Sequence, residues 1–208
     1  MKKHRDSYSQ LGQDNWVLEK LDYKENGFFV EAGISDGIYW SNTYLLETAY
    51  GWTGIGVEAA KMFHSRLKEA RNCSLDFNIL WDKDDEIEAF HSRGYIGGTP
   101  AEFATEWDRL ERRLSGNKLE LPTISLNSLL LKYNAPSTID YISLDTEGSE
   151  LKILQAFDFK AWDVSLWTIE HNKDLRTDGE AYYQSLVSLL SSQGYKHHQK
   201  GVDLWFWR

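Results

Sequence analysis

The chain has 208 residues, 41% of them hydrophobic and 26% charged, so it is long enough to form one globular domain around its own core. Its formal net charge of −9 argues against a nucleic-acid partner, because contact with phosphate backbones needs a basic surface. The single cysteine, Cys73, excludes an internal disulfide, and the sequence contains neither a secretory signal nor an apolar run near the ~18 residues of a membrane span, so we expect a cytoplasmic protein.

Short apolar runs alternate with helical patterns along the whole chain. The predicted strands are FFVEAG (28–33), TGIGVE (53–58), SLDFNIL (74–80), IDYISLD (139–145), SLWTIE (165–170), YKHH (195–198) and VDLWFWR (202–208). Helical patterns lie around Leu45 and at residues 59–71, 99–114, 150–157 and 179–194. Strands that alternate with helices indicate an α/β fold with a doubly wound, mostly parallel sheet. The last two strands predict a hairpin that adds an antiparallel C-terminal edge.

We expect a single domain over residues 1–208, with a helical cap at residues 1–27. Residues 91–122 are predicted to be an insertion that covers the substrate, because a glycine-rich segment there precedes a capped helix. The SQLGQD segment near Gln10 and Gln13, together with Tyr95 and Trp107, is expected to complete that pocket.

The loop after the first strand reads Glu31-x-Gly33-x-Ser35-Asp36-Gly37. A dinucleotide site would need G-x-G-x-x-G, but Ser35 stands in place of the second glycine and Asp36 would repel a pyrophosphate. No basic residue lies near Glu31 or Asp36 in the sequence, and a ligand with positive charge and no phosphate fits better. S-adenosylmethionine is such a ligand, and Glu58, at the end of the second strand, is placed to bind its ribose hydroxyls. Glu58 would serve NAD equally well, and the glycines alone also suit a tight turn in any α/β protein.

Six segments together resemble the FkbM family of S-adenosylmethionine-dependent methyltransferases. They are SQLGQD, GFFVEAGISDGIYWSNTYLLE, GWTGIGVEA, NILWDKDDEIEAF, IDYISLDTEGSELKIL and TIEHN, and they run in order from about Tyr8 to the C-terminus. The resemblance implies a Rossmann-like methyltransferase fold. It also implies transfer of a methyl group to a hydroxyl of a small molecule, which in this family is mostly a sugar or a polyketide-derived natural product.

The resemblance also implies which residues bind the cofactor. The methionine side would be held by the first loop and the ribose by Glu58, with the adenine beside Trp81 and Asp82 and the methyl group above Asp145. The full implied set is Glu31, Gly33, Ser35, Asp36, Gly37, Asn42, Glu58, Ala59, Trp81, Asp82 and Asp145. The chain departs from the family pattern at Ile34-Ser35, where Ala-Asn is usual, and at Ala59, where proline is common.

Candidate catalytic residues lie in LDTEGSE and IEHN, at the ends of two predicted core strands. They are Asp145, Glu147, Glu170 and His171, of which His171 has an ordinary titration range that suits a general base. His171 could equally be a structural histidine bonded to a neighbouring carboxylate. Asp145, Glu170 and His171 could instead hold Mg²⁺, which prefers oxygen ligands. Two other functions stay open, an NAD-dependent oxidoreductase and a non-catalytic module that binds S-adenosylmethionine.

Overall fold

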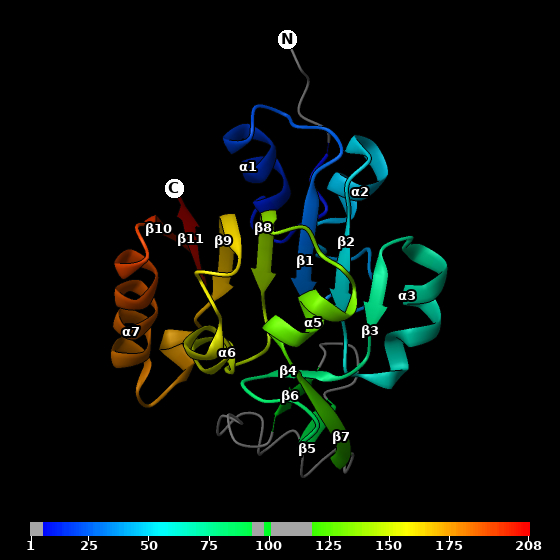
Figure 1. The fold of residues 1–208 in the computed structure, drawn as a ribbon. Coiled ribbons are helices and arrows are strands. Elements are labelled where there is room, and N and C mark those ends of the chain that lie inside the picture. The colour runs from blue at the N-terminus through cyan, green and yellow to red at the C-terminus, as the bar shows by residue number, and fades with distance from the viewer. Residues whose placement is uncertain (1–5, 93–97, 101–117) are drawn as a thin grey trace.

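A seven-stranded sheet forms the centre of the computed structural model, which describes residues 6–92, 98–100 and 118–208 (Figure 1). Its strand order is β10-β11-β9-β8-β1-β2-β3. The strands are β1 (Phe28–Ala32), β2 (Thr53–Val57), β3 (Ser74–Asp76), β8 (Thr138–Leu144), β9 (Asp163–Glu170), β10 (Lys196–Lys200) and β11 (Asp203–Trp207). Five consecutive strands in this order, β9 to β3, are parallel, whereas β11 pairs antiparallel with β9 and with β10. The predicted α/β fold with a mostly parallel seven-stranded sheet is confirmed.

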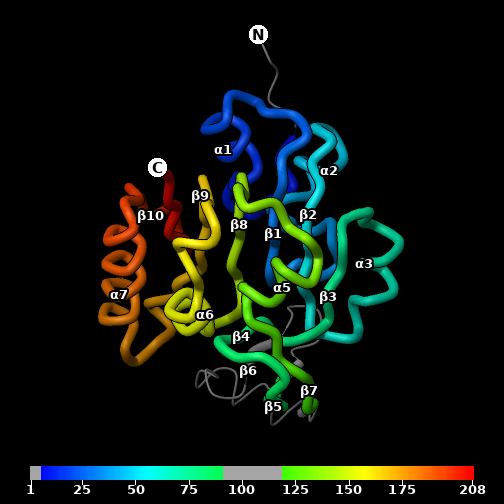
Figure 2. Tube along the Cα trace, viewed as in Figure 1, coloured from blue at the N-terminus to red at the C-terminus, as the bar shows by residue number. Residues whose placement is uncertain are grey.

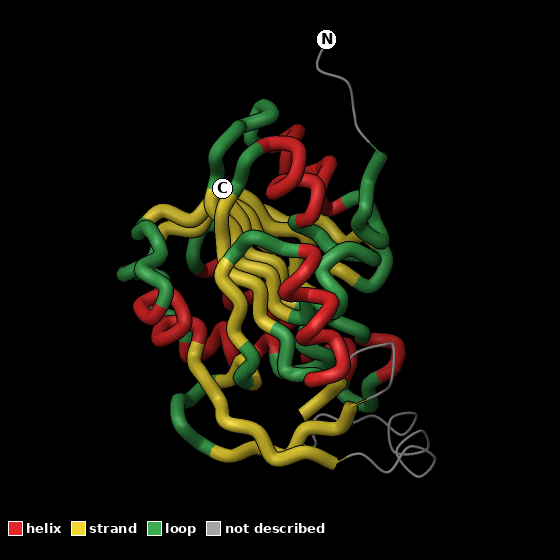
Figure 3. The backbone as a smooth tube through the Cα atoms, turned by 90° about the vertical axis from the view of Figure 1, so that its right-hand side faces the viewer, coloured by secondary structure: helices red, strands yellow, loops and turns green. Residues whose placement is uncertain are grey.

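Helices cover both faces of this sheet (Figure 3). One face packs against α5 (Leu126–Lys132), α6 (Glu150–Ala156) and α7 (Gly179–Ser192), and the other against α1 (Gln13–Lys20) and α2 (Tyr44–Tyr50). Neighbouring strand residues alternate between the two cores, as Phe29 faces α1 and α2 while Val30 faces the opposite core. Burial on both faces explains why these strands are nearly continuous apolar runs.

The predicted strand SLDFNIL is divided between two sheets, so its prediction as one strand is wrong. β3 ends at Asp76, and the chain then turns to form β4 (Ile79–Trp81) in a second sheet of order β4-β7-β5-β6. The Asp76 carboxylate accepts the Asn78 N–H at 2.9 Å, which fixes this turn. The remaining strands of the second sheet are β5 (Ile87–Ser92), β6 (Gly98–Pro100) and β7 (Lys118–Ser125). This sheet lies beyond the carboxyl ends of β1, β2 and β8 (Figures 1 and 2).

The other short elements are α3 (His64–Ala70) and the 3₁₀ helices η1 (Lys61–Phe63) and η4 (Lys173–Leu175). Most of the predicted insertion at 91–122 and of the helix at 99–114 falls outside the described residues, as do Tyr95 and Trp107. Within the described part of the chain, no helix combines the length and apolar character needed to cross a bilayer. The single domain, the cap at residues 1–27 and the cytoplasmic location stay predictions.

Candidate functional site

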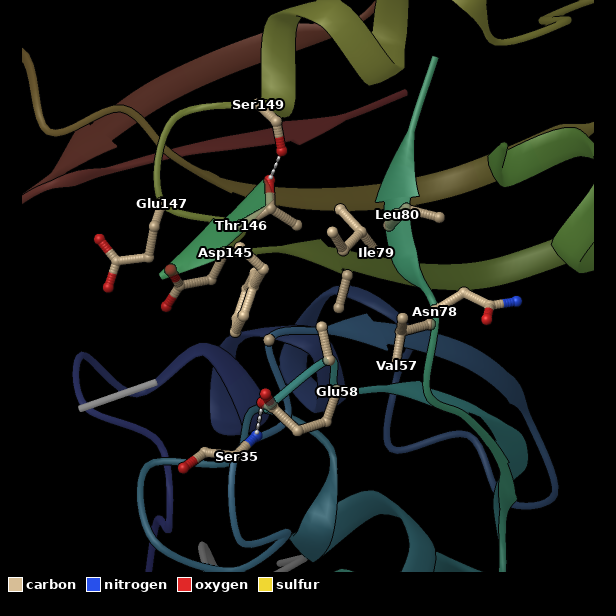
Figure 4. Close-up of a pocket in the computed structure, with 14 residues that line it drawn as sticks. Ser35, Val57, Glu58, Asn78, Ile79, Leu80, Asp145, Thr146, Glu147 and Ser149 are labelled. Carbon is tan, nitrogen blue, oxygen red and sulfur yellow. Dashed lines mark hydrogen bonds between the residues drawn. The ribbon is translucent and has the colours of Figure 1, made fainter. Parts of the chain in front are cut away.

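The first cavity lies at the carboxyl ends of β1, β2 and β8 and encloses about 580 Å³, including its opening to solvent (Figure 4). Its walls are of two kinds. Apolar side chains from β2, β4 and β5 form one part, namely Val57, Ile79, Leu80 and Phe90. Polar groups form the other part, namely Ser35, Glu58, Asn78, Asp145, Thr146, Glu147 and Ser149. An apolar slot with a few polar groups at its end suits a nucleoside, whose base is flat and whose ribose is polar.

Gly33 makes the close approach between β1 and β8 that shapes this cavity. Its φ is +81°, and a Cβ atom added there would lie 1.9 Å from the carbonyl oxygen of Asp145. Only glycine combines this backbone conformation with this lack of space. The sequence therefore requires a glycine here for packing against Asp145.

Glu58 lies on the opposite wall from Asp145 and is 5% exposed (Figure 4). Its two carboxylate oxygens accept N–H groups from Ser35 at 2.9 Å and Ala60 at 2.7 Å. Burial raises the pKa of Glu58 to about 7, although both of these N–H groups favour the ionised form. Each carboxylate oxygen keeps a further lone pair, so Glu58 can still accept hydrogen bonds from two ligand hydroxyls.

Glu31 lies beneath the first loop and lines neither described cavity. Its oxygens accept the Asn42 N–H at 2.6 Å and the Ser41 hydroxyl at 2.8 Å, and Arg71 lies 3.6 Å away. The Arg71 guanidinium is fully buried and also binds Glu47, the Gly37 carbonyl and two hydroxyls of the 41–43 turn. Glu31 is thus paired inside the protein, and the contact with the cofactor expected from the sequence stays a prediction.

The expectation that no basic residue offsets the acids of the first loop is wrong. Arg71 pairs with Glu31, and Arg66 lies 3.2 Å from the Asp36 carboxylate. Both arginines belong to the region of α3, which packs against the loop from another part of the chain. Asp36 itself accepts the N–H groups of Ile38 and Tyr39, so its role is to hold the turn.

The backbone donors of this loop are also used within the protein. Four of them donate to backbone carbonyls, those of Gly33, Ile34, Gly37 and Ser41. Four more donate to the carboxylates of Glu58, Asp36 and Glu31, those of Ser35, Ile38, Tyr39 and Asn42. A phosphate cradle depends on such N–H groups pointing at the ligand. These eight N–H groups are therefore not free to bind a phosphate.

Three carboxylates meet where β8 and β9 end. Asp145, Glu147 and Glu170 each place one oxygen within 4.8 Å of the others, the one such group of potential metal ligands found among the described residues. Burial, and then the charge of Glu147, raise the pKa of Asp145 well above its ordinary value. Burial, and then the charge of Asp145, do the same for the pKa of Glu170. Neighbouring carboxylates of this kind share a proton readily.

The second cavity adjoins the first and encloses about 1000 Å³, including its opening. The two cavities share Gly33, Ser35 and Asp145. The second is also lined by Gln10, Gln13, Ile34, Tyr39, Trp40, Asn42, Ser143, Leu144, Thr168, Glu170 and Asp203. Gln10 and Gln13 thus line a pocket as expected, and Asp145 lies at the junction of the two spaces.

His171 is buried and lines neither cavity. Its Nδ1 accepts the Lys173 N–H at 3.1 Å, and its ring meets Tyr183 edge-on at 5.2 Å. Burial lowers the pKa of His171, which favours the neutral ring. The carboxylate group at the cavity junction contains Glu147 where the sequence suggested His171. These contacts favour the structural interpretation of His171.

The predicted cofactor residues fall into three groups. Gly33, Ser35, Glu58, Ala59 and Asp145 line the first cavity, and Asn42 lines the second. Glu31, Asp36 and Gly37 line neither cavity, but they fix the conformation of the loop that follows β1. Trp81 and Asp82 also line neither, because Trp81 is buried in β4 and Asp82 lies 3.8 Å from Lys152.

Sequence reasoning missed the residues that form the apolar wall, Ile79, Leu80 and Phe90, and it also missed Arg71. The apolar run of residues 74–80 could have indicated Ile79 and Leu80. They were missed because the whole run was predicted to be one strand of the main sheet.

Comparison with known proteins yields one family. The model of the methyltransferase FkbM domain matches residues 30–197. No curated protein matches the sequence. Solved structures with a similar fold include a precorrin-6y C5,15-methyltransferase from Geobacter metallireducens GS-15, at 10% identity and a TM-score of 0.48 over 93% of this chain and 84% of that chain. Another is fibrillarin from Aeropyrum pernix with bound S-adenosyl-L-methionine, at 13% identity and a TM-score of 0.42 over 88% of this chain and 66% of that chain.

Proposed function

Because the chain belongs to the FkbM family of S-adenosylmethionine-dependent methyltransferases, we propose that it methylates a hydroxyl oxygen of a sugar, a glycan or a natural product. The observation that carries this proposal is the meeting of two cavities at Asp145. One has the apolar slot and the Glu58 carboxylate that suit a nucleoside, and the other contains hydroxyl, amide and carboxylate side chains.

The residues of the first cavity fit the cofactor. Gly33 allows the Asp145 backbone to approach the first loop closely. The apolar wall of Ile79, Leu80 and Phe90 would hold the adenine, and Glu58 would accept hydrogen bonds from the ribose hydroxyls. Asn78, at the same wall, could read the polar edge of the base. The cofactor, when bound, supplies a methyl group on a positively charged sulfur.

The chain's own contribution to the transfer is to align the acceptor hydroxyl and to remove its proton. Asp145 and Glu170 are suited to the second task because burial raises both pKa values, followed by the charge of Glu147 at Asp145 and the charge of Asp145 at Glu170. One carboxyl keeps a proton, and a carboxylate oxygen of the other accepts the proton of the hydroxyl. The acceptor oxygen would thus lose its proton to a carboxylate of this chain and gain the methyl group that the cofactor would supply.

The test combines binding with turnover. Calorimetric titration should show micromolar binding of S-adenosylmethionine and of its demethylated product, with no binding of NAD. Turnover is then measured by release of the demethylated product with hydroxyl-bearing small molecules, with added Mg²⁺ and with EDTA. The EDTA arm tests whether the carboxylates of Asp145, Glu147 and Glu170 need a metal. Binding of NAD alone would overturn the proposal in favour of an oxidoreductase. Binding of the adenosyl ligands without methyl transfer to any acceptor would favour a non-catalytic module.

A further inference from the structure

Two aromatic side chains stand at the second cavity in an arrangement that the hydrophobic core does not explain. Tyr39 and Trp40 are 64% and 51% exposed, and their rings stack with centroids 4.5 Å apart at an interplanar angle of 28°. Both residues line the cavity. Large aromatic surfaces exposed at a polar cavity are typical of ligand contacts, because they lose unfavourable contact with water when a ligand covers them.

The backbone that holds this pair is strained at one residue. Trp40 has a φ of +59°, in the left-handed region that a bulky residue rarely adopts. A parallel β-bridge between Ser9 and Trp40 fixes it, and the Tyr39 N–H donates to the Asp36 carboxylate at 2.8 Å. Strained residues that the surrounding structure fixes in this way gather at ligand sites. The pair is therefore held in place by its surroundings, and a ligand can stack on the outer face that the two stacked rings leave exposed.

The other residues that line the cavity are mostly polar and include several hydrogen-bond acceptors. Two of its side chains, Asn42 and Glu170, each keep a buried oxygen atom, Oδ1 and Oε2, that has no hydrogen-bond partner among the described residues. A buried acceptor without a donor is unfavourable unless a ligand or water completes it. The amide oxygen of Asn42 needs a donor, and the Glu170 carboxyl can accept or, when protonated, donate. A ligand hydroxyl can do both.

The ionisable groups of the cavity also favour a ligand without a phosphate. Asp145, Glu170 and Asp203 contribute carboxyl groups to the lining, and no lysine, arginine or histidine is among its described residues. Asp203 is itself held by the Gln13 amide at 2.7 Å. A phosphate group brings negative charge and only acceptor oxygens, so in this lining it would meet three carboxyl groups and no positive charge.

We propose that the second cavity binds the ring of an uncharged sugar acceptor, stacked on Tyr39 and Trp40, and rejects the phosphorylated and nucleotide-activated forms of that sugar. The stacking would use the C–H face of the ring, and the ring hydroxyls would donate to Asn42 and Glu170. This inference rests on the proposed function and narrows its acceptor. It implies that the acceptor is supplied by a glycosyl-transfer reaction, which removes the nucleotide before the methyl group is added.

The experiment compares matched acceptors. Initial rates of release of the demethylated cofactor are measured with methyl glycosides of glucose, mannose, galactose, rhamnose and fucose, with the corresponding sugar 1-phosphates, and with UDP-glucose. We expect at least one methyl glycoside to be a substrate, and the phosphorylated form of the same sugar to have a kcat/KM at least tenfold lower. Equal or faster turnover of a phosphorylated form would overturn the proposal, as would the failure of every methyl glycoside.

Variants of the aromatic pair give a second measurement. Trp40→Ala should raise the KM for the glycoside about tenfold and leave the Kd for S-adenosylmethionine within twofold of the wild-type value. Trp40→Phe should have a KM close to that of the wild type. The control is Leu131→Ala, which removes another exposed apolar side chain, on α5, that lines neither cavity. An unchanged KM in Trp40→Ala, with circular dichroism showing a folded protein, contradicts the stacking role.

The same data separate this inference from the function on which it rests. Loss of S-adenosylmethionine binding in the wild-type protein would overturn both. If that binding is intact and only non-sugar hydroxyl compounds such as phenols are methylated, the proposed methyltransferase function stands and the sugar site is refuted.

Discussion

The pKa of Glu58 makes nucleoside binding dependent on pH. Glu58 is 5% exposed at the end of β2, and burial raises its pKa to about 7. The ionised carboxylate can accept hydrogen bonds from both ribose hydroxyls, whereas the protonated form has one acceptor fewer and presents a donor. Binding should therefore select the ionised form and release a proton, and the affinity for the nucleoside should rise from pH 6 to pH 8.

The expected size follows from this pKa. With a pKa of about 7, roughly one carboxyl in eleven is ionised at pH 6, half are ionised at pH 7 and nearly all at pH 8. The apparent Kd should fall about tenfold between pH 6 and pH 8, which corresponds to about 1.4 kcal/mol. Most of the fall should occur below pH 7.

The assay is calorimetric titration with 5′-methylthioadenosine at pH 6, 7 and 8. This ligand has the nucleoside of the cofactor but no α-amino group, so ligand titration does not contribute to the slope. Repetition at pH 6 in two buffers with different ionisation enthalpies should show release of about 0.9 proton per bound ligand.

Two variants test the assignment to Glu58. Glu58→Gln should bind more weakly and lose the pH dependence. His64 is the matched control, since its ring nitrogen lies 3.0 Å from the Glu58 carbonyl and it titrates below its ordinary range because burial lowers its pKa. His64→Gln should keep the slope of the wild type. A wild-type affinity that does not change with pH, or an equal slope in Glu58→Gln, would refute the role of Glu58 at the ribose.

Three further predictions concern stability and the loop. Because the folded state raises the pKa of Glu58 from 4.5 to about 7, the ligand-free protein binds this proton more tightly than the unfolded chain does. Its free energy of unfolding, measured by urea titration, should therefore fall by up to roughly 3 kcal/mol as pH rises from 4.5 to about 7. A free energy of unfolding that rises over this pH range would contradict the raised pKa. Arg71→Met should lower the free energy of unfolding by about 3–5 kcal/mol, because it leaves buried carboxylates unpaired, whereas Arg66→Met at an exposed pair should cost less than about 1 kcal/mol. Gly33→Ala should abolish adenosyl binding in calorimetry, because the new Cβ would collide with the Asp145 carbonyl; wild-type affinity would contradict the close approach.

The sequence predicted the parts of the fold that local pattern determines. The parallel strands β1, β2, β8 and β9 are buried on both faces, so each is a continuous apolar run that is visible without a structure. The break between β3 and β4 is not visible in this way, because one side chain, Asp76, turns the chain by accepting a backbone N–H. β7 was missed since Pro122 interrupts its strand pattern, although the strand pairs with both β4 and β5.

For the site too, the sequence predicted the residues that local pattern determines and missed those that depend on contacts between distant parts of the chain. Residues at strand ends, such as Glu58, Asp145 and Glu170, were identified because parallel strands bring their carboxyl ends to one edge of the sheet. Arg71 was not identified, because it lies 40 positions after Glu31 and meets it only when α3 packs against the first loop. Trp40 was not identified either, since composition cannot separate an exposed tryptophan from the eight others in the chain.

The position of Arg71 changes the reason for which we expect the first loop to reject a dinucleotide. The absence of neighbouring positive charge, inferred from the sequence, is not a feature of the folded protein, because Arg66 and Arg71 lie beside the two acids. Arg71 is nevertheless unable to bind a pyrophosphate, since its side chain is fully buried and donates to Glu47, Gly37, Ser41 and Thr43.

Eight of the backbone N–H groups from Gly33 to Asn42 are also unable to bind a pyrophosphate, because they already donate to carbonyls or carboxylates of the protein. Binding of a phosphate by this loop would require several of these bonds to break, and buried carboxylates would lose their donors. We therefore expect the loop to discriminate against phosphates because its N–H donors are already used, and not because of its charge. This is why weakening the Asp36–Arg66 pair should leave the preference for a phosphate-free nucleoside intact.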